Sequence, residues 1–236
     1  MKIITLSQKP KAVLFDLSGT LINSLHRGDR DVLDEICYKY SGQPYLEVRK
    51  KKDHSKSLRH NFNRFFDGEG SKAYHEYIEK LTAAIPLSPV FNGVAETLAA
   101  LKEQQTRLAV VSNRPRSYIS TALDYHDLRD TFDSVISSDK FPGIEKPAPE
   151  VIQYALEELD LPSVNGDHVV MVGDTSVDIE CADNADVIPI LFSDKERNTE
   201  RVQERLRNPD KKPVILASNY SDLRKILVEP FKKMEL

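Results

Sequence analysis

An apolar run near the N-terminus that stops at an aspartate constrains the fold of this chain more than any other feature. Residues Ala12–Phe15 contain no polar side chain, as expected of a β-strand that is buried on both faces. Asp16 follows at once and is followed by a turn of small residues. In open α/β sheets ligands bind outside the carboxyl ends of the strands, so Asp16 is expected to face a site. The alternative is an aspartate that only caps a turn, because Asp, Ser and Gly are common turn residues.

Strand-like and helix-like segments alternate along most of the chain. Apolar runs that are typical of buried strands recur at residues 107–111, 132–137, 168–172, 188–192 and 214–217. Apolar residues at helical spacing occur at residues 93–105, 117–128, 149–159 and 220–228. Strands separated by helix-length segments favour a parallel sheet, so we expect an α/β fold with a doubly wound, Rossmann-like parallel sheet.

The segment after the first strand has a different character. It is polar, rich in Lys, His, Tyr and Phe, and lacks a strong strand pattern. Apolar residues at helical spacing predict helices over residues 31–40 and 72–84. We expect a helical cap inserted at residues 22–85, with residues 1–21 and 86–236 forming the α/β core domain. The alternative is that these helices pack on the sheet as part of one domain.

Composition narrows the classes of function. The 236 residues include 33 Lys and Arg against 37 Asp and Glu, a formal net charge of −4, which gives no general electrostatic reason to expect a nucleic-acid partner. Cys37 and Cys181 lack CxxC spacing and are typical of reduced thiols in a cytosolic protein. The N-terminal apolar run is too short for a secretory signal, and no stretch approaches the ~20 apolar residues of a membrane helix. We therefore expect a cytoplasmic monomer or homodimer without a membrane partner.

Polar side chains occur where three of the apolar strands end. Asp16, Ser112 and Asp174 directly follow strands, and Lys146 and Asp178 lie in neighbouring segments. Parallel strands have their carboxyl ends at one edge of the sheet, so these side chains can meet although they are distant in sequence. Clustered carboxylates repel one another, and Mg²⁺, a hard cation that prefers oxygen ligands, relieves this repulsion.

Such a set suits phosphoryl transfer. A metal ion and a lysine neutralise the transferring oxygens while a carboxylate attacks in line. Each residue also has a simpler explanation: Ser112 and Asn113 as a helix cap, Lys146 as a solvated loop residue, and Asp174 with Asp178 as a cap and a surface acid. A single site accounts for all of them together.

Four motifs, in the same order along the chain, resemble those of the haloacid dehalogenase-like hydrolase superfamily. They are FDLSGTL at residues 15–21, VSN at 111–113, EKPAPE at 145–150 and VGDTSVD at 172–178. The chain is most similar to the Mg²⁺-dependent phosphatases of that superfamily that carry a small helical cap after the first strand. The resemblance implies a phosphoric monoester hydrolase that acts on a small phosphorylated metabolite.

The resemblance also implies a role for each matching residue. The Asp16 position is the nucleophile that becomes an aspartyl phosphate, the Ser112 position hydrogen-bonds the phosphoryl oxygens, and the Lys146 position stabilises them. The expected catalytic residues are Asp16, Ser18, Ser112 and Lys146. The expected phosphate-binding residues are Asp16, Ser112, Asn113 and Lys146. The expected Mg²⁺ ligands are Asp16, the backbone carbonyl of Ser18, Asp174 and Asp178, some of them acting through water.

One position departs from the family pattern. Family phosphatases usually carry a second aspartate two residues after the nucleophile, which protonates the leaving group and later activates water. Here that position is Ser18, whose hydroxyl cannot exchange a proton near neutral pH as a carboxyl group does. Losing general acid–base catalysis costs about 10²–10⁴-fold in rate. A backbone carbonyl survives any substitution, so we expect Mg²⁺ binding to persist and proton transfer to be impaired.

Two alternatives for the phosphatase reaction follow from the missing aspartate. Leaving groups of low pKa, such as those of aryl or acyl phosphates, need little protonation, so these substrates would still be cleaved while sugar or alkyl phosphates are cleaved poorly. Alternatively, a histidine of the cap supplies the proton, and the candidates are His26, His54 and His60.

Two other functions stay open. Family members that cleave a carbon–phosphorus bond also lack this aspartate and use a cap lysine as a Schiff base, for which the candidates are Lys50, Lys51, Lys52 and Lys56. The simpler explanation of that charge run is a solvated helix face. The other alternative is a catalytically impaired protein that binds a phosphorylated ligand without turnover. A haloacid dehalogenase proper needs no metal and would leave Asp174 and Asp178 without a role.

Overall fold

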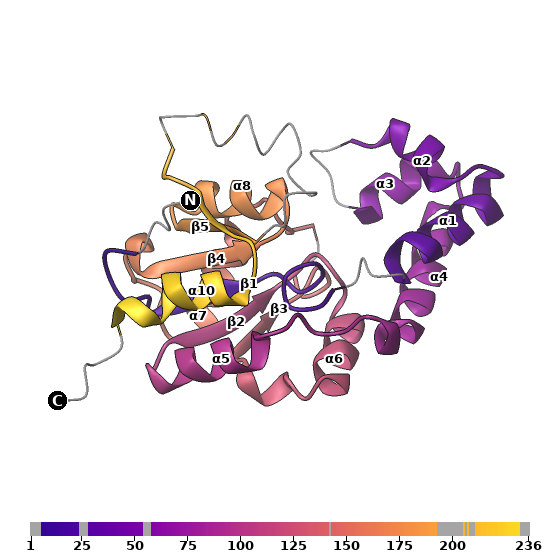
Figure 1. Ribbon diagram of the computed structural model, residues 1–236. Coiled ribbons are helices and arrows are strands. Elements are labelled where there is room, and N and C mark those ends of the chain that lie inside the picture. Colours follow the sequence, from indigo (N-terminus) through magenta and orange to yellow (C-terminus); the bar gives the residue numbers. More distant parts are fainter. Residues whose placement is uncertain are drawn as a thin grey trace.

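The centre of the protein is a six-stranded parallel sheet in the computed structural model, which describes residues 6–23, 28–53, 58–141, 143–192, 205, 207 and 211–231 (Figure 1). The strands are β1 (Ala12–Phe15), β2 (Arg107–Val111), β3 (Ser134–Ile136), β4 (Val169–Gly173), β5 (Ile188–Phe192) and β6 (Ile215–Ala217). Their order is β3-β2-β1-β4-β5-β6, and every neighbouring pair is parallel. The expected α/β class with a Rossmann-like parallel sheet is confirmed.

Strand β1 lies in the middle of this sheet and pairs with β2 on one side and β4 on the other. The chain adds β2 and β3 in one direction, and then β4, β5 and β6 in the other. The strand order therefore reverses between β1 and β4. In open α/β sheets the ligand crevice lies outside the carboxyl ends of the strands at such a reversal, so the ends of β1 and β4 are where a site is expected.

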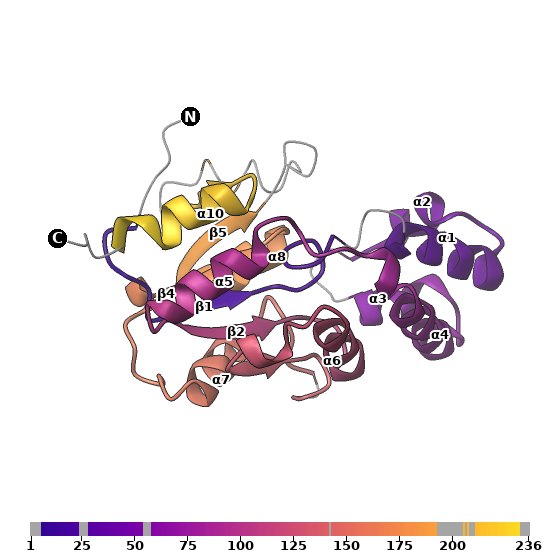
Figure 2. The same ribbon diagram turned by 60° about the horizontal axis from the view of Figure 1, so that its bottom comes forward.

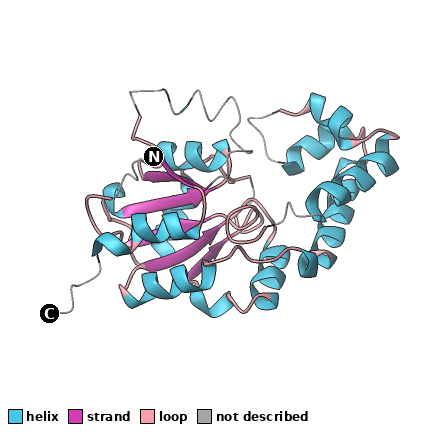
Figure 3. Cartoon of the chain, in the orientation of Figure 1, coloured by secondary structure: helices cyan, strands magenta, loops and turns pink. Residues whose placement is uncertain are grey.

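Helices cover both faces of the sheet, which is therefore doubly wound, as expected (Figures 2 and 3). One face carries α5 (Val94–Glu103), α6 (Arg116–Tyr125) and α10 (Tyr220–Leu227), and the other carries α7 (Glu150–Glu158) and α8 (Ser176–Asn184). Successive side chains of a strand point to opposite faces. Val13 and Phe15 accordingly join the first apolar cluster, and Ala12 and Leu14 join the second. This explains why β1 is apolar at every position.

The element bounds follow the predicted ones closely. The strands expected at residues 107–111 and 188–192 have those bounds in the structure. The strand expected at 132–137 is shorter, because only three residues of β3 pair with β2. The described residues also contain short 3₁₀ helices at Arg49–Lys51, Ile85–Leu87, Arg129–Thr131, Gly166–His168 and Glu229–Phe231.

Four helices between β1 and α5 lie together beside the sheet (Figures 1 and 2). They are α1 (Gly28–Ser41), α2 (Tyr45–Val48), α3 (Leu58–Phe65) and α4 (Gly70–Ala83). Helices α1 and α4 were predicted, whereas α2 and α3 were not. The ring of Phe62 in α3 lies between 5.4 and 6.2 Å, centroid to centroid, from the rings of Phe65, Phe66, Tyr74 and Tyr77. This aromatic cluster packs α3 against α4.

The chain leaves the sheet for this group and returns from it at adjacent points. The backbone N–H of Asn23 donates to the carbonyl of Pro89 at 2.8 Å, and the N–H of Phe91 donates to that of Leu21 at 3.1 Å. Such paired crossings are what an inserted unit requires, and they support the proposal that residues 22–85 are a cap on a core of residues 1–21 and 86–236. One apolar cluster nevertheless runs through both parts, because α4 also packs against α6.

The two cysteines of the chain are free thiols. Cys37 and Cys181 are both buried and unbridged, and burial raises the pKa of each thiol to about 12. Among the described residues, none of the helices combines the length and the apolar character that crossing a membrane requires.

The aromatic cluster yields a stability prediction. Phe62 is fully buried, and replacing it with Ala removes contacts with four rings, so we expect Phe62→Ala to lower the free energy of unfolding by about 3–5 kcal/mol. Urea unfolding followed by circular dichroism measures this change. Tyr38→Ala in α1 is the control, since Tyr38 is 57% exposed and its loss should change stability by about 0.5 kcal/mol or less. Equal losses in the two variants would contradict a stabilising role of the cluster.

Candidate active site

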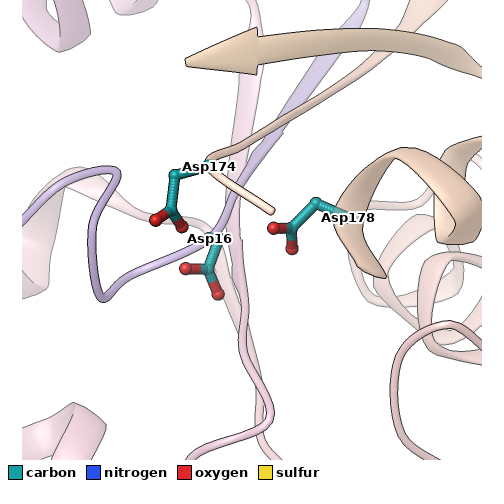
Figure 4. Close-up of side chains that lie close together, drawn as sticks. All are labelled: Asp16, Asp174 and Asp178. Atoms are coloured by element: carbon teal, nitrogen blue, oxygen red, sulfur yellow. The ribbon is translucent and has the colours of Figure 1, made fainter. Parts of the chain in front are cut away.

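Three aspartates meet at the carboxyl ends of β1 and β4. Asp16 directly follows β1, Asp174 directly follows β4, and Asp178 lies in the first turn of α8. Figure 4 shows their carboxylates pointing toward one another. Each offers an oxygen within 4.8 Å of the oxygens of the other two. The predicted convergence of these acids is therefore present.

Lys146 lies between two of these aspartates. Its Nζ donates to Oδ1 of Asp16 and to Oδ1 of Asp178, at 2.6 Å in each case, and the side chain is buried. Burial alone would lower the pKa of Lys146, but the charges of Asp16 and Asp178 outweigh it and raise the pKa above its usual value. The ammonium group therefore stays charged at neutral pH.

The acid cluster still carries more negative than positive charge. Burial raises the pKa of Asp16; the Lys146 ammonium opposes this shift, and the charge of Asp178 adds to it. Three carboxylates and one ammonium group give the site a net negative charge, and the atoms that could bind a metal ion are all carboxylate oxygens. Hard divalent cations such as Mg²⁺ bind carboxylate oxygens and prefer this donor chemistry. The residues present therefore fit the expected metal ion.

Asp178 is oriented by the start of its own helix. Thr175, the residue before α8, donates to Oδ2 of Asp178 from its backbone N–H at 3.0 Å and from its hydroxyl at 2.6 Å. This capping box satisfies helix donors that would otherwise lack partners. It leaves Oδ1 of Asp178 directed at Lys146.

Asn113 holds the loop that delivers Lys146. Its side-chain Nδ2 donates to the Lys146 carbonyl, and its Oδ1 accepts from the Lys146 N–H, at 2.8 Å in both cases. Both polar atoms of the amide are thus engaged by the backbone of Lys146. This pairing makes Asn113 a positioning residue, and its expected contact with a phosphoryl group stays a prediction.

Two glycines let the carboxylates approach the backbone. Gly19 has φ +92°, and a Cβ built there would lie 2.3 Å from Oδ2 of Asp174. A Cβ at Gly173 would lie 2.2 Å from Cγ of Asp178. Both distances are far below van der Waals contact, so any larger residue would push an acid out of the cluster. The glycines of the FDLSGTL and VGDTSVD motifs are therefore part of the site's geometry.

The two serines of the predicted site lie beside the acids. Ser112 is buried, and its Oγ accepts from the N–H of Arg114 at 3.4 Å. The Ser18 hydroxyl is buried next to the Tyr118 hydroxyl. Burial raises the pKa of Tyr118, so this phenol keeps its proton at neutral pH. A phenol that keeps its proton cannot accept another, so neither Ser18 nor Tyr118 supplies a base at neutral pH.

Every predicted site residue lines a single cavity of about 410 Å³. The sheet side of the cavity is formed by Asp16, Ser18, Ser112, Asn113, Arg114, Lys146, Pro147, Asp174, Thr175, Val177 and Asp178. The opposite wall comes from the four-helix group and consists of Asp29, Arg30, Leu33, Tyr45, Lys52, Leu58, Tyr74 and Tyr77. The volume is at the low end of the range for ligand pockets, so the cavity suits a small ligand.

The candidate histidines for the missing acid and the candidate lysines for a Schiff base differ in their position relative to the cavity. His60 is exposed and does not line the cavity, and His26 and His54 lie outside the described residues. Among the candidate lysines, Lys52 lines the cavity and Lys50 is exposed and paired with Glu47. Lys51 is exposed, and Lys56 lies outside the described residues.

The sequence analysis missed a cluster at the junction of the sheet and the helices. Arg114 forms an ion pair with Asp29 of α1 at 2.9 Å and donates to the Tyr77 hydroxyl of α4 at 2.7 Å. Tyr77 in turn donates to Asp29. Arg114 directly follows the VSN motif, which was a usable signal, but no pattern linked it to Asp29, 85 positions away in the sequence.

Comparisons with known proteins agree with this fold. The sequence model of the family described as "Haloacid dehalogenase-like hydrolase" matches residues 13–191. The phosphoglycolate phosphatase of Vibrio cholerae is 28% identical over 202 residues, which cover 74% of this chain and 80% of that protein. The phosphoglycolate phosphatase of Rhodobacter capsulatus is 27% identical over 195 residues, covering 80% of this chain and 86% of that protein. The crystal structure of CbbY from Rhodobacter sphaeroides in complex with phosphate has a TM-score of 0.69 at 19% identity, covering 91% and 96% of the two chains, a likeness of fold.

The tight approach at Gly19 yields a prediction with a matched control. Gly19→Ala adds a Cβ 2.3 Å from Asp174, whereas Gly42→Ala adds one in open space at a similarly positive φ of +69°. Both variants bear the backbone cost of a left-handed residue, about 1–2 kcal/mol. We expect Gly19→Ala to lose at least about 1 kcal/mol more, and also to weaken divalent-cation binding. Urea unfolding and calorimetric titration with Mg²⁺ measure the two effects, and identical behaviour of the variants would contradict this geometry.

Proposed function

The chain belongs to the haloacid dehalogenase-like hydrolase family, and we propose that it cleaves small phosphorylated metabolites with Mg²⁺ through an aspartyl phosphate on Asp16. That it is a phosphatase, a phosphoric monoester hydrolase, follows from the family and from the phosphatases it matches. The observation that carries the finer proposal is the pair of 2.6 Å contacts by which Lys146 holds Asp16 and Asp178 inside the cavity.

Three side chains act on the phosphoryl group in this proposal. Asp16 attacks phosphorus with a carboxylate oxygen, while the ester oxygen leaves from the opposite side. Lys146, already 2.6 Å from Asp16, neutralises a phosphoryl oxygen as the new bond forms. Ser112, at the end of β2, donates its hydroxyl to another phosphoryl oxygen. Fixed donors and charges of this kind stabilise the transferring group because they need no reorganisation during the reaction.

The metal ion fits the same edge of the sheet. Asp16, Asp174, Asp178 and the backbone carbonyl of Ser18 would hold Mg²⁺, since the three carboxylates already converge within 4.8 Å. When bound, Mg²⁺ supplies positive charge that neutralises phosphoryl oxygens. The capping contacts of Thr175 and the closeness of Gly19 to Asp174 keep these ligands in place.

Proton transfer is the step that this site supports poorly. The leaving oxygen needs a proton, and the later attack of water on the aspartyl phosphate needs a base. Neither Ser18 nor Tyr118 supplies this base at neutral pH. Asp29 is the remaining carboxylate among the described residues that line the cavity, but its two oxygens accept from Arg114 and Tyr77. Substrates with good leaving groups should therefore react fastest.

The names of the relatives point to a substrate. Both curated relatives are phosphoglycolate phosphatases, so 2-phosphoglycolate is the first natural phosphate monoester to test on this chain. Lys52 in the cavity wall keeps the phosphonate-cleaving alternative testable, because a Schiff base there would be trapped by borohydride. The binding-protein alternative predicts ligand binding without phosphate release.

The first functional prediction concerns the nucleophile and the metal. Phosphate release from p-nitrophenyl phosphate and 2-phosphoglycolate should require Mg²⁺, stop with EDTA, and fall at least about 10³-fold in Asp16→Asn, because an amide cannot attack phosphorus. Asp186→Asn, which changes an exposed carboxylate after α8, is the control and should keep full activity.

Three outcomes would contradict that prediction. If no phosphate monoester is cleaved although calorimetry detects Mg²⁺ binding, the chain is a binding protein. If a phosphonate is cleaved and borohydride with that substrate attaches to Lys52, the reaction is carbon–phosphorus cleavage. Equal activity of Asp16→Asn and wild type would place the nucleophile elsewhere.

The second functional prediction concerns Ser18. Ser18→Asp restores a proton carrier, so turnover of alkyl phosphates should rise by about 10²–10⁴-fold, and that of aryl phosphates much less. In Ser18→Asn the new side chain has nearly the same shape as Asp but no transferable proton, so this variant should give no such gain. Steady-state kinetics with ethyl phosphate and p-nitrophenyl phosphate measure both effects. The same increase for both substrates would refute the idea that proton transfer limits this enzyme.

A further inference from the structure

Arg114 is a cation of the cavity that the proposed reaction does not use; Arg30 and Lys52, in the wall formed by the four-helix group, are two others. It follows Ser112 by two positions and Asn113 by one along the loop after β2, and its own N–H donates to the Ser112 hydroxyl. Its guanidinium lies 5.4 Å from the ring centroid of Tyr77 and 5.7 Å from that of Tyr118. Flanking rings fix a guanidinium plane and stabilise its charge. The cavity therefore carries a fixed, planar cation next to the residue proposed to bind phosphate.

The present partner of Arg114 comes from the other wall of the cavity. Asp29 of α1 accepts from Nη2 at 2.9 Å, and the Tyr77 hydroxyl accepts from Nη1 at 2.7 Å. The side chains of Arg114 and Asp29 are 14% and 13% exposed, so the pair is largely shielded from water. A shielded guanidinium without an anion is costly. Asp29 thus neutralises Arg114 across the cavity.

A carboxylate of a small substrate can make the same contacts as Asp29. A guanidinium has five N–H donors in a planar fork that matches a carboxylate, and the described residues engage Nη1 and Nη2 once each. Lys146 pairs with Asp16 and Asp178 and serves the phosphoryl group in the proposed reaction. Arg114 follows Ser112 by two positions in the same loop, so it is well placed for a second anionic group of the same ligand.

We propose that Arg114 is the specificity-determining residue of this site and that it binds a carboxylate of the substrate in exchange for Asp29. The substrate class is then a short phosphorylated hydroxy acid, with the phosphoryl group at Asp16 and the carboxylate at Arg114. The cavity volume of about 410 Å³ limits the carbon chain between the two groups. This inference rests on the proposed phosphatase function and narrows its substrates.

The test compares two substrates that differ at one group. 2-Phosphoglycolate carries the carboxylate, and ethyl phosphate has a methyl group in its place. In Arg114→Gln, kcat/KM for 2-phosphoglycolate should fall on the order of 10²-fold, mainly through KM, whereas kcat/KM for ethyl phosphate should change by less than about threefold. Arg114→Lys keeps the charge without the planar fork and should show an intermediate loss. Arg116→Gln removes an exposed arginine two positions away and should match wild type.

Asp29→Asn separates substrate recognition from a structural latch. If Asp29 only neutralises Arg114, its removal should lower KM for 2-phosphoglycolate severalfold and leave KM for ethyl phosphate unchanged. If the pair instead only ties α1 to the sheet, Asp29→Asn and Arg114→Gln would impair both substrates equally, and the proposal would be wrong. Thermal unfolding of each variant reports whether the fold is retained, and the double variant Asp29→Asn/Arg114→Gln removes both charges at once.

A binding measurement keeps this inference distinct from the proposed function. Calorimetry on Asp16→Asn, with Mg²⁺ present, should give tighter binding of 2-phosphoglycolate than of ethyl phosphate, and Arg114→Gln in that background should abolish the difference. Wild-type hydrolysis of both substrates without any preference overturns the role of Arg114 and leaves the phosphatase function intact. Absence of hydrolysis of every monoester overturns the proposed function, whatever the binding preference.

Discussion

Lys146 donates to Asp16 and Asp178 from within a buried cluster of acids, and the arrangement of the active site depends on this contact. Carboxylates this close repel one another, and burial removes the water that would screen them. Removing one partner of a buried ion pair typically costs about 3–5 kcal/mol. The surrounding contacts are best understood as fixing this charge arrangement: Asn113 holds the backbone of Lys146, and Thr175 orients Asp178.

The sheet explains why this cluster forms where it does. β1 and β4 are neighbours, although more than 150 residues separate them in sequence, and the strand order reverses between them. Asp16 and Asp174 follow these two strands directly, so the reversal places both acids at the mouth of one crevice. Backbone space is needed as well as topology, because a side chain at Gly19 or Gly173 would occupy the positions of the carboxylates. The strand order and the space left by the two glycines therefore fix the position of the acids together.

The four-helix group changes what the crevice can recognise. Without its residues the crevice would be an open edge with acids, Lys146 and Arg114. With Asp29 and Tyr77 opposite Arg114, the crevice becomes a cavity that contains a second set of charged side chains. In the function proposed here, the reacting groups belong to the sheet, and the choice of ligand depends on contacts between the sheet and the helices. On the same proposal, Ser18 in place of a carboxyl group limits which leaving groups the site can release efficiently.

The sequence by itself determined the local structure and the chemical identity of the site. Apolar runs located the strands, and the residues that end them, Asp16, Ser112 and Asp174, could be assigned to one edge because parallel strands share that edge. Helix α3 escaped prediction because its two buried phenylalanines lie in a short segment dominated by polar residues. Local patterns extend over one element only, and so they do not encode which elements meet.

Only the tertiary structure decided the remaining contacts. The pairing of Arg114 with Asp29 depends on how α1 and α4 pack against the loop after β2, and nothing near either residue signals it. The same is true of Asn113, whose side chain turned out to engage the backbone of Lys146. Such contacts are set by the packing of whole helices against the sheet, which is a sum of many small apolar contacts spread over the chain.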